Sequence, residues 1–146
     1  MLFTGTSSHD PNCSRYGGGG IRLQPNLGTT GATSTNSVNW STFAIGDIRT
    51  ISVWAKGPAG QAANATMFGS GVNSLGERFD IRTSPGGTNL RVEIAGAGQN
   101  TTTPVANSIW HHVAIVVPND NAVLGDFLFY VDGVSVPNTN SQAQTL

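Results

Sequence analysis

An Asp-Gly pair, Asp132-Gly133, lies between two apolar runs in residues 127–136. A two-residue hairpin turn requires positive φ angles, which Gly adopts without strain, so this pattern predicts two antiparallel strands joined by a tight turn. The preceding residues 109–117 are apolar at most positions and contain no Lys, Arg, Asp or Glu. Because exposed sheet edges usually carry such charges, we expect a central strand here, covered on both faces.

The composition excludes a mostly helical fold. Charged residues make up 10% of the 146 residues, against roughly 25% in ordinary soluble domains. There are two Glu and one Lys, so few strong helix formers are present, while Gly, Ser, Thr and Asn favour turns. The length fits one main domain, and we predict that it is all-β.

Strand and turn signals alternate from residue 40 onward. The expected strands are residues 50–56, 66–68, 78–82 and 89–94, and residues 95–107 are expected to form a loop. Ser84-Pro-Gly-Gly87 predicts a turn that joins two of these strands as an antiparallel hairpin. Charged side chains on the outer face of this hairpin would then place opposite charges across the strands, as a solvated face with weak ion pairs.

Residues 1–37 differ from the rest of the chain. They are dominated by Gly, Ser, Thr, Asn and Pro, and they include a run of four glycines at residues 17–20. No Lys follows this run, so it predicts a flexible loop and not a phosphate-binding loop. We expect a flexible N-terminal arm with one edge strand at residues 21–24, followed by a sandwich domain at residues 38–146.

Three strings in the second part of the chain occur in a characteristic order. They are Ile51-Ser-Val-Trp-Ala-Lys56, Trp110-His-His-Val-Ala114 and Tyr130-Val-Asp-Gly133. In this order the chain resembles laminin-G-like, concanavalin A-like lectin and glucanase domains. The resemblance implies an antiparallel two-sheet β-sandwich of the jelly-roll type, a fold found in lectins, carbohydrate-binding modules, adhesion proteins and viral appendages.

Such domains usually have further strands after the Val-Asp-Gly hairpin. Residues 138–146 show no clear strand pattern. The sandwich is therefore expected to lack a closing strand, to belong to a longer chain, or to share a strand with a neighbouring chain, because an open sheet edge accepts an added strand.

Several classes of function are disfavoured. The net charge of −1 and the scattered basic residues argue against nucleic-acid binding. No apolar stretch is long enough to span a membrane, and no signal peptide is visible. Glu77 and Asp80 are expected on opposite faces of a strand, and Glu93 stands apart from them. His111 and His112 are adjacent, so one faces each way. We therefore expect no enzyme.

Aromatic rings and short polar groups are typical of sugar-binding sites. Trp54 is expected to be partly exposed, since it shares a strand face with Ser52 and Lys56. The candidate ligand-binding residues are Trp54, Trp40, Lys56, Arg82 and Arg91.

Related sandwiches often bind Ca²⁺ at a loop rim through Asp and Asn oxygens. The resemblance therefore implies a possible calcium site where such residues are densest. Its candidate ligands are Asn119, Asp120, Asn121 and Asp126.

Together these features predict a non-catalytic binding or adhesion module that recognises carbohydrate at a cell surface or in an extracellular assembly. The alternative is a virion structural protein, either a phage capsid decoration or a tail fibre component. The expected partner is a glycan or a neighbouring protein chain, including a second copy in a homo-oligomer.

Overall fold

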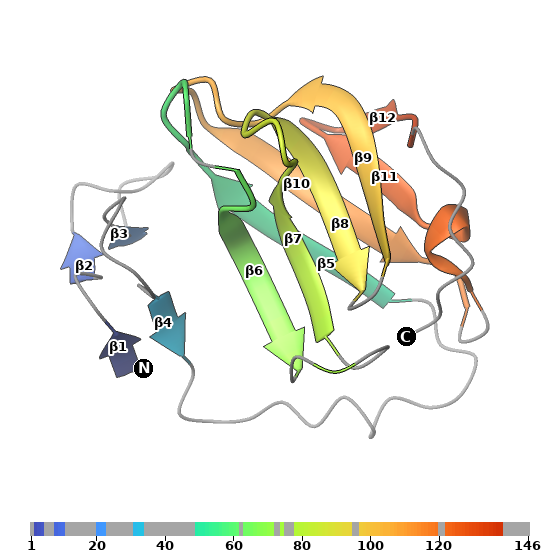
Figure 1. Cartoon of the computed structure of the whole chain (residues 1–146), viewed down its shortest axis with the longest axis horizontal. Coiled ribbons are helices and arrows are strands. Elements are labelled where there is room, and N and C mark those ends of the chain that lie inside the picture. The colour runs from blue at the N-terminus through green and yellow to red at the C-terminus, as the bar shows by residue number, and fades with distance from the viewer. Residues whose placement is uncertain are drawn as a thin grey trace. The chain divides into compact units, whose positions relative to one another are not determined.

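In a computed structural model, the residues described are 2–4, 8–10, 20–22, 31–33, 49–61, 63–71, 74, 78–94, 97–119 and 122–138. The chain divides into two compact units, Met1–Phe43 and Ala44–Leu146 (Figure 1). The strands of the first unit are β1 (Leu2–Thr4), β2 (Ser8–Asp10), β3 (Gly20–Arg22) and β4 (Gly31–Thr33). There β1 pairs with β4 and β2 with β3, both antiparallel. Strand β3 overlaps the expected edge strand, and the glycine run at 17–19 lies outside the described residues.

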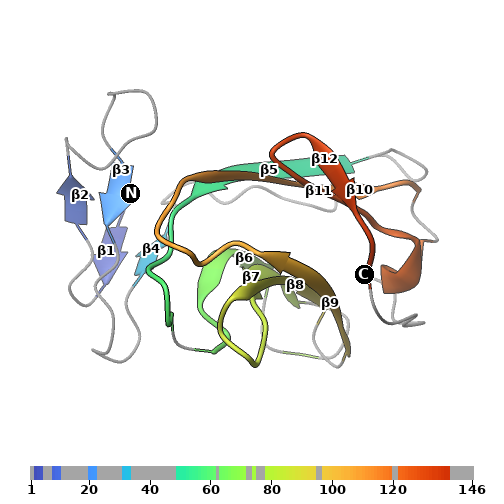
Figure 2. The same ribbon diagram turned by 90° about the horizontal axis from the view of Figure 1, so that it is seen from above.

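The second unit contains two four-stranded antiparallel sheets, with strand orders β12-β11-β10-β5 and β6-β7-β8-β9. Its elements are β5 (Arg49–Ala55), β6 (Thr66–Gly71), β7 (Arg78–Thr83), β8 (Asn89–Ile94), β9 (Ala97–Pro104), β10 (His111–Val117), the short 3₁₀ helix η2 (Leu124–Asp126), β11 (Leu128–Val131) and β12 (Val134–Val136). Figure 2 shows the two sheets as facing layers. The predicted antiparallel β-sandwich is confirmed.

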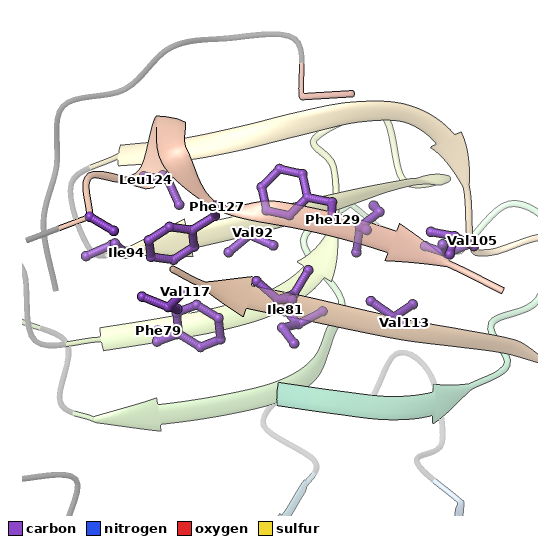
Figure 3. Packing of buried hydrophobic residues seen from close by; sticks show 14 residues of the cluster. Phe79, Ile81, Val92, Ile94, Val105, Val113, Val117, Leu124, Phe127 and Phe129 are labelled. Atoms are coloured by element: carbon purple, nitrogen blue, oxygen red, sulfur yellow. The ribbon is translucent and has the colours of Figure 1, made fainter. Parts of the chain in front are cut away.

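The core lies between the two sheets and is built from alternate residues of each strand, as the pleat of a strand requires. Ile81, Val92, Val113 and Ile115 are completely buried, and Phe129 is almost so (Figure 3). Phe79 packs beside Phe127, with ring centroids 6.4 Å apart. Phe79 and Ile81 share the inward face of β7, as the sequence predicts.

Strand β9 corrects one expectation. Residues 95–107 were expected to form a loop, but residues 97–104 form an edge strand of eight residues paired with β8. The inward positions of β9 include Gln99 and Thr101, which are buried, and the Thr101 hydroxyl donates to the Leu90 carbonyl oxygen at 3.2 Å. Because these inward side chains are polar, the apolar alternation that marks a strand is missing.

Strand β10 is central in its sheet, between β5 and β11, as predicted. It is not covered on both faces, however, as was expected from the sequence. Val113, Ile115 and Val117 are buried, whereas the alternate residues on the other face are only half-buried. Ile109 precedes the strand and is 56% exposed. The strand is therefore packed on one face and open on the other.

The Asp132-Gly133 turn is confirmed. Asp132 has φ 53° and Gly133 has φ 80°, and β11 pairs with β12 on either side. Beyond β12, Asn138 forms an isolated antiparallel bridge with Thr101 of β9. Residues 139–146, on which the expectation about a closing strand depends, lie outside the described part of the chain.

Candidate functional site

The outer face of the β12-β11-β10-β5 sheet carries three rings. We define the aromatic face as Ser52, Trp54, His112, Ala114 and Tyr130. In the register of the strands, His112 lies opposite Trp54, and Ala114 lies between Ser52 and Tyr130. Trp54 is 36% exposed, and its ring centroid is 5.1 Å from that of His112, with a tilt of 44°.

The exposure of β5 alternates along the strand. Ser52 and Trp54 are exposed, and so is Lys56, which follows the strand, while Val53 packs against the core. The predicted exposure of Trp54 is therefore confirmed. An indole held beside an imidazole, with short polar groups nearby, offers a flat apolar surface that remains in contact with water.

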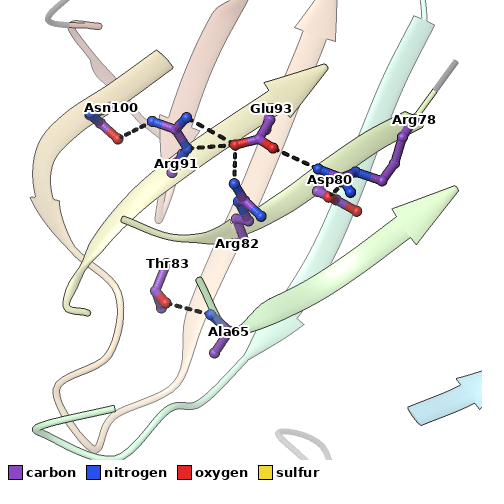
Figure 4. A network of polar contacts seen from close by, with 8 residues as sticks. All are labelled: Ala65, Arg78, Asp80, Arg82, Thr83, Arg91, Glu93 and Asn100. Atoms are coloured by element: carbon purple, nitrogen blue, oxygen red, sulfur yellow. Dashed lines mark hydrogen bonds and ion pairs between the residues drawn. The ribbon is translucent and has the colours of Figure 1, made fainter. Parts of the chain in front are cut away.

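The outer face of the other sheet carries a cluster of charged residues. We define the arginine network as Arg78, Asp80, Arg82, Arg91 and Glu93 (Figure 4). Arg78 contacts Asp80 through Nε at 2.9 Å and Glu93 Oε1 through Nη2 at 2.7 Å. Arg91 donates to Glu93 Oε2 through Nε at 3.0 Å and Nη2 at 2.9 Å, and Arg82 pairs with the same oxygen.

The register of this network corrects the sequence prediction. Asp80 lies directly opposite Glu93, and Arg82 lies directly opposite Arg91, so like charges face each other and opposite charges meet on the diagonals. Glu93 therefore does not stand apart. Moreover, Asp80 and Glu93 are only 7% and 8% exposed, so the expected solvated face is wrong. Buried carboxylates require close positive partners, which the three arginines supply.

The pKa values of Asp80 and Glu93 shift in opposite directions within the arginine network. Burial works against ionisation of Glu93, but hydrogen bonds and positive charge from Arg91, Arg82 and Arg78 outweigh it and lower the pKa of Glu93. Burial raises the pKa of Asp80, and attraction to Arg78 and Arg82 cancels only part of that effect. The nearby charge of Glu93 raises the pKa of Asp80 further.

Glycines flank the network on both neighbouring strands. Gly69 of β6 lies opposite Asp80, and Gly98 of β9 lies opposite Glu93. A Cβ at position 69 would lie 2.7 Å from Asp80 Oδ1, and one at position 98 would collide with the Arg91 guanidinium. Arg91 thus extends across Gly98, and its Nη1 donates to Asn100 Oδ1 at 2.9 Å. The sequence reasoning missed these residues, because only the register shows what a glycine makes room for.

A second polar cluster fixes the β11-β12 turn. His111 is buried, and its Nδ1 lies 2.7 Å from Asp132 Oδ2, while its Nε2 lies 2.9 Å from Asn107 Oδ1. The other Asp132 oxygen accepts the backbone N–H of His112 at 2.8 Å. Burial opposes ionisation of Asp132, but these hydrogen bonds outweigh it and lower its pKa. The two histidines face opposite ways, as predicted, and His111 holds the turn in place.

The structure does not bring the candidate ligand-binding residues together. Trp54 and Lys56 belong to one sheet, whereas Arg82 and Arg91 belong to the arginine network on the other. Trp40 lies outside the described residues. There are thus two separate candidate faces, and the binding roles of these residues stay predictions.

The calcium site also stays a prediction. Asp120 and Asn121 lie outside the described residues, as does Glu77. Asp126 Oδ2 accepts the N–H of Val123 at 3.0 Å at the start of η2, and the Asn119 carbonyl oxygen accepts the N–H of Ala122 at 3.2 Å. Among the residues with a described placement, no three His, Cys, Asp or Glu gather as a metal site.

Comparison with protein families gives one match. The family model described as the concanavalin A-like lectin/glucanases superfamily matches residues 27–146. No curated protein and no solved structure gives a significant match. In the described ranges, no helix has the length and apolar character needed to cross a membrane.

Proposed function

Because this chain belongs to the concanavalin A-like lectin/glucanase superfamily, we propose that it is a non-catalytic carbohydrate-binding module whose aromatic face contacts the sugar. The observation that most supports this proposal is that Trp54 is 36% exposed on that face. Laminin-G-like domains are typically extracellular, and the module acts at a cell surface or within an extracellular assembly.

The aromatic face supports this role by its geometry. Sugar rings present C–H groups on their flat sides, and these pack against the face of an indole. Trp54 is held against His112 on the neighbouring strand, so little conformational freedom is lost when a ligand binds. Ser52 and Lys56 are exposed nearby and supply polar groups for sugar hydroxyls.

The carboxylates of the other sheet support a non-catalytic role. Hydrolysis of a glycosidic bond needs one carboxyl group to donate a proton and a second to attack or activate water. Both Glu93 oxygens contact arginines, and Asp80 is paired with Arg78. A carboxylate held by several guanidinium groups, as Glu93 is, is a weak nucleophile and a weak base.

The test is a glycan-binding screen followed by calorimetry with the best neutral ligand. Trp54→Ala is expected to weaken binding about tenfold or more, equivalent to about 1.4 kcal/mol. Trp54→Phe retains a ring and keeps part of the affinity. Val134→Ala is the control, because Val134 is exposed on the edge strand β12, apart from the aromatic face. Equal affinities for Trp54→Ala and the unsubstituted protein would refute the proposal.

A structural role in a virion or other assembly is the second candidate. It is favoured by Leu128 and Val134, which are 46% and 65% exposed on β11 and β12. Strand β12 is at the edge of its sheet, and an exposed apolar side chain on an edge strand, such as Val134, marks a place where another chain can pair. A defined oligomer in light scattering, dispersed by Leu128→Asp or Val134→Asp and accompanied by no glycan binding, would favour this role over the first.

A further inference from the structure

The arginine network contains more hydrogen-bond donors than its carboxylates can accept. Three arginines surround two acids, which leaves a net charge of +1 when both acids are ionised. One oxygen, Glu93 Oε2, is shared by Arg82 and Arg91. The Nε of Arg82 is buried and has no acceptor within the part of the chain that the structure describes.

The arginines lie nearer the surface than the acids. The side chains of Arg78, Arg82 and Arg91 are 26%, 16% and 16% exposed, whereas those of Asp80 and Glu93 are 10% exposed. The group that meets solvent on this face is therefore guanidinium more than carboxylate. A cationic surface of this kind favours an anionic ligand.

The two neighbouring strands place no side chain of their own over the network at the positions opposite its acids. These positions are Gly69 on β6 and Gly98 on β9, and the space above them is taken by Asp80 and by the Arg91 guanidinium. The planar guanidinium group matches carboxylate and sulfate oxygens with two parallel hydrogen bonds. We infer that the arginine network is a second ligand site, which binds the carboxylate or sulfate group of an acidic sugar.

This inference rests on the proposed function in one respect, that the ligand is a glycan. It differs in place, since the network and the aromatic face lie on different sheets. It also differs in chemistry, because the aromatic face recognises sugar C–H groups and the network recognises charge. The protein would thus select glycans that carry acidic groups.

The network also makes the binding of sulfate dependent on pH. Burial raises the pKa of Asp80, so acidification neutralises Asp80 while Glu93, whose pKa is lowered, stays ionised. The net charge then changes from +1 to +2. The charged groups that face Asp80 from β7 and β8 are the three arginines and Glu93, and the described residues opposite the two acids on β6 and β9 are Gly69 and Gly98.

The experiment is calorimetry with sodium sulfate, a sulfated chondroitin tetrasaccharide, a tetragalacturonate and a neutral tetrasaccharide at constant ionic strength. Arg82→Gln is expected to weaken binding of the anionic probes about tenfold. Arg49→Gln, which removes the same charge from β5, is the matched control. Asp80→Asn is expected to strengthen sulfate binding at pH 7 and to abolish its increase at lower pH.

Asp80→Asn keeps the test decisive even if Arg82→Gln fails to fold, because it predicts a gain. Binding of the sulfated or the carboxylated tetrasaccharide supports the inference and identifies the anionic group. Binding of neither, or equal effects of Arg82→Gln and Arg49→Gln, overturns it. Loss of neutral binding in Trp54→Ala without any anion binding would overturn this inference alone and leave the proposed function intact.

Discussion

Asp80 and Glu93 lie directly opposite each other on β7 and β8, and the pKa of the first is raised while that of the second is lowered. The difference arises from the arginines. Arg91 and Arg82 both contact Glu93, whereas Asp80 has one close ion pair, to Arg78, among the residues that the structure describes. Glu93 thus contacts all three arginines, whereas Asp80 has the weaker share of positive charge and lies next to a second carboxylate.

The first prediction concerns the charge that holds the network together. Glu93→Gln is expected to lower the free energy of unfolding by about 3–5 kcal/mol, because it leaves three buried or half-buried guanidinium groups around one carboxylate. Asp80→Asn removes a charge that its surroundings disfavour and is expected to cost much less. Urea unfolding at pH 7 measures both. Equal decreases in the free energy of unfolding for the two variants would contradict the central role of Glu93 in holding the arginines.

The second prediction concerns acid. Glu93 and Asp132 have lowered pKa values in the folded protein, so they stabilise it above their ordinary pKa values of 4.5 and 3.8, and this stabilisation is lost as pH falls through the lowered values. Asp80 acts in the opposite direction. Its pKa is raised above 3.8, so stability is gained as pH falls through the raised value.

Urea unfolding between pH 7 and pH 2 separates these contributions. Asp132→Asn is expected to flatten the acid loss of stability, and Asp80→Asn is expected to steepen it, because the compensating gain disappears. Identical pH profiles for these two variants and the unsubstituted protein would contradict the assigned pKa directions.

The third prediction concerns the glycine beneath Arg91. Gly98→Ala places a Cβ where the guanidinium lies, so Arg91 must move away from Glu93 and Asn100. The free energy of unfolding is expected to fall by about 1–3 kcal/mol. Gly86→Ala is the control, since its Cβ would have only an ordinary contact with Ser84 Oγ at 3.7 Å. If thermal melts show the same decrease in stability for both variants, a Cβ at position 98 does not displace Arg91.

The fourth prediction concerns the β11-β12 turn. Asp132→Ala removes the acceptor for His111 Nδ1 and for the His112 N–H, and it places Ala at φ 53°. We expect a loss of about 1–2 kcal/mol of stability. Asp132→Asn tolerates the positive φ and keeps one acceptor oxygen, so it is expected to lose less. If urea unfolding shows that Asp132→Asn is less stable than Asp132→Ala, the role given to the Asp132 carboxylate and its positive φ is wrong.

Most strands and the Asp132-Gly133 turn are predictable from the sequence, because alternation of apolar residues and a turn with positive φ are local patterns in the order of the residues. The β7-β8 hairpin shows the limit of this reasoning. A period of two tells which face a side chain lies on, but a slip of two residues keeps every face and changes every partner. For this reason the outward position of Arg82 was predicted, and its partner across the strand was not.

The candidate sites divide in the same way. The exposure of Trp54 was predictable, since polar residues stand two positions away on each side. The positions of Gly98 and Asn100 beside Arg91 were not, because β9 has polar residues on its inward face and no apolar alternation. Where a strand buries Gln99 and Thr101, sequence patterns do not reveal even that it is a strand.

The pairing of β5 with β10 has a consequence for synthesis of the chain. The strands β6, β7, β8 and β9 pair with sequence neighbours, whereas within the described part of the chain β5 pairs with β10, which follows this whole meander. At about 5–20 residues per second, a ribosome adds the residues from the end of β5 to the end of β10 in roughly 3–12 s. During that time Ile51 and Val53 lack the strand that later lies beside them, so β5 is an unpaired strand that can associate with other chains.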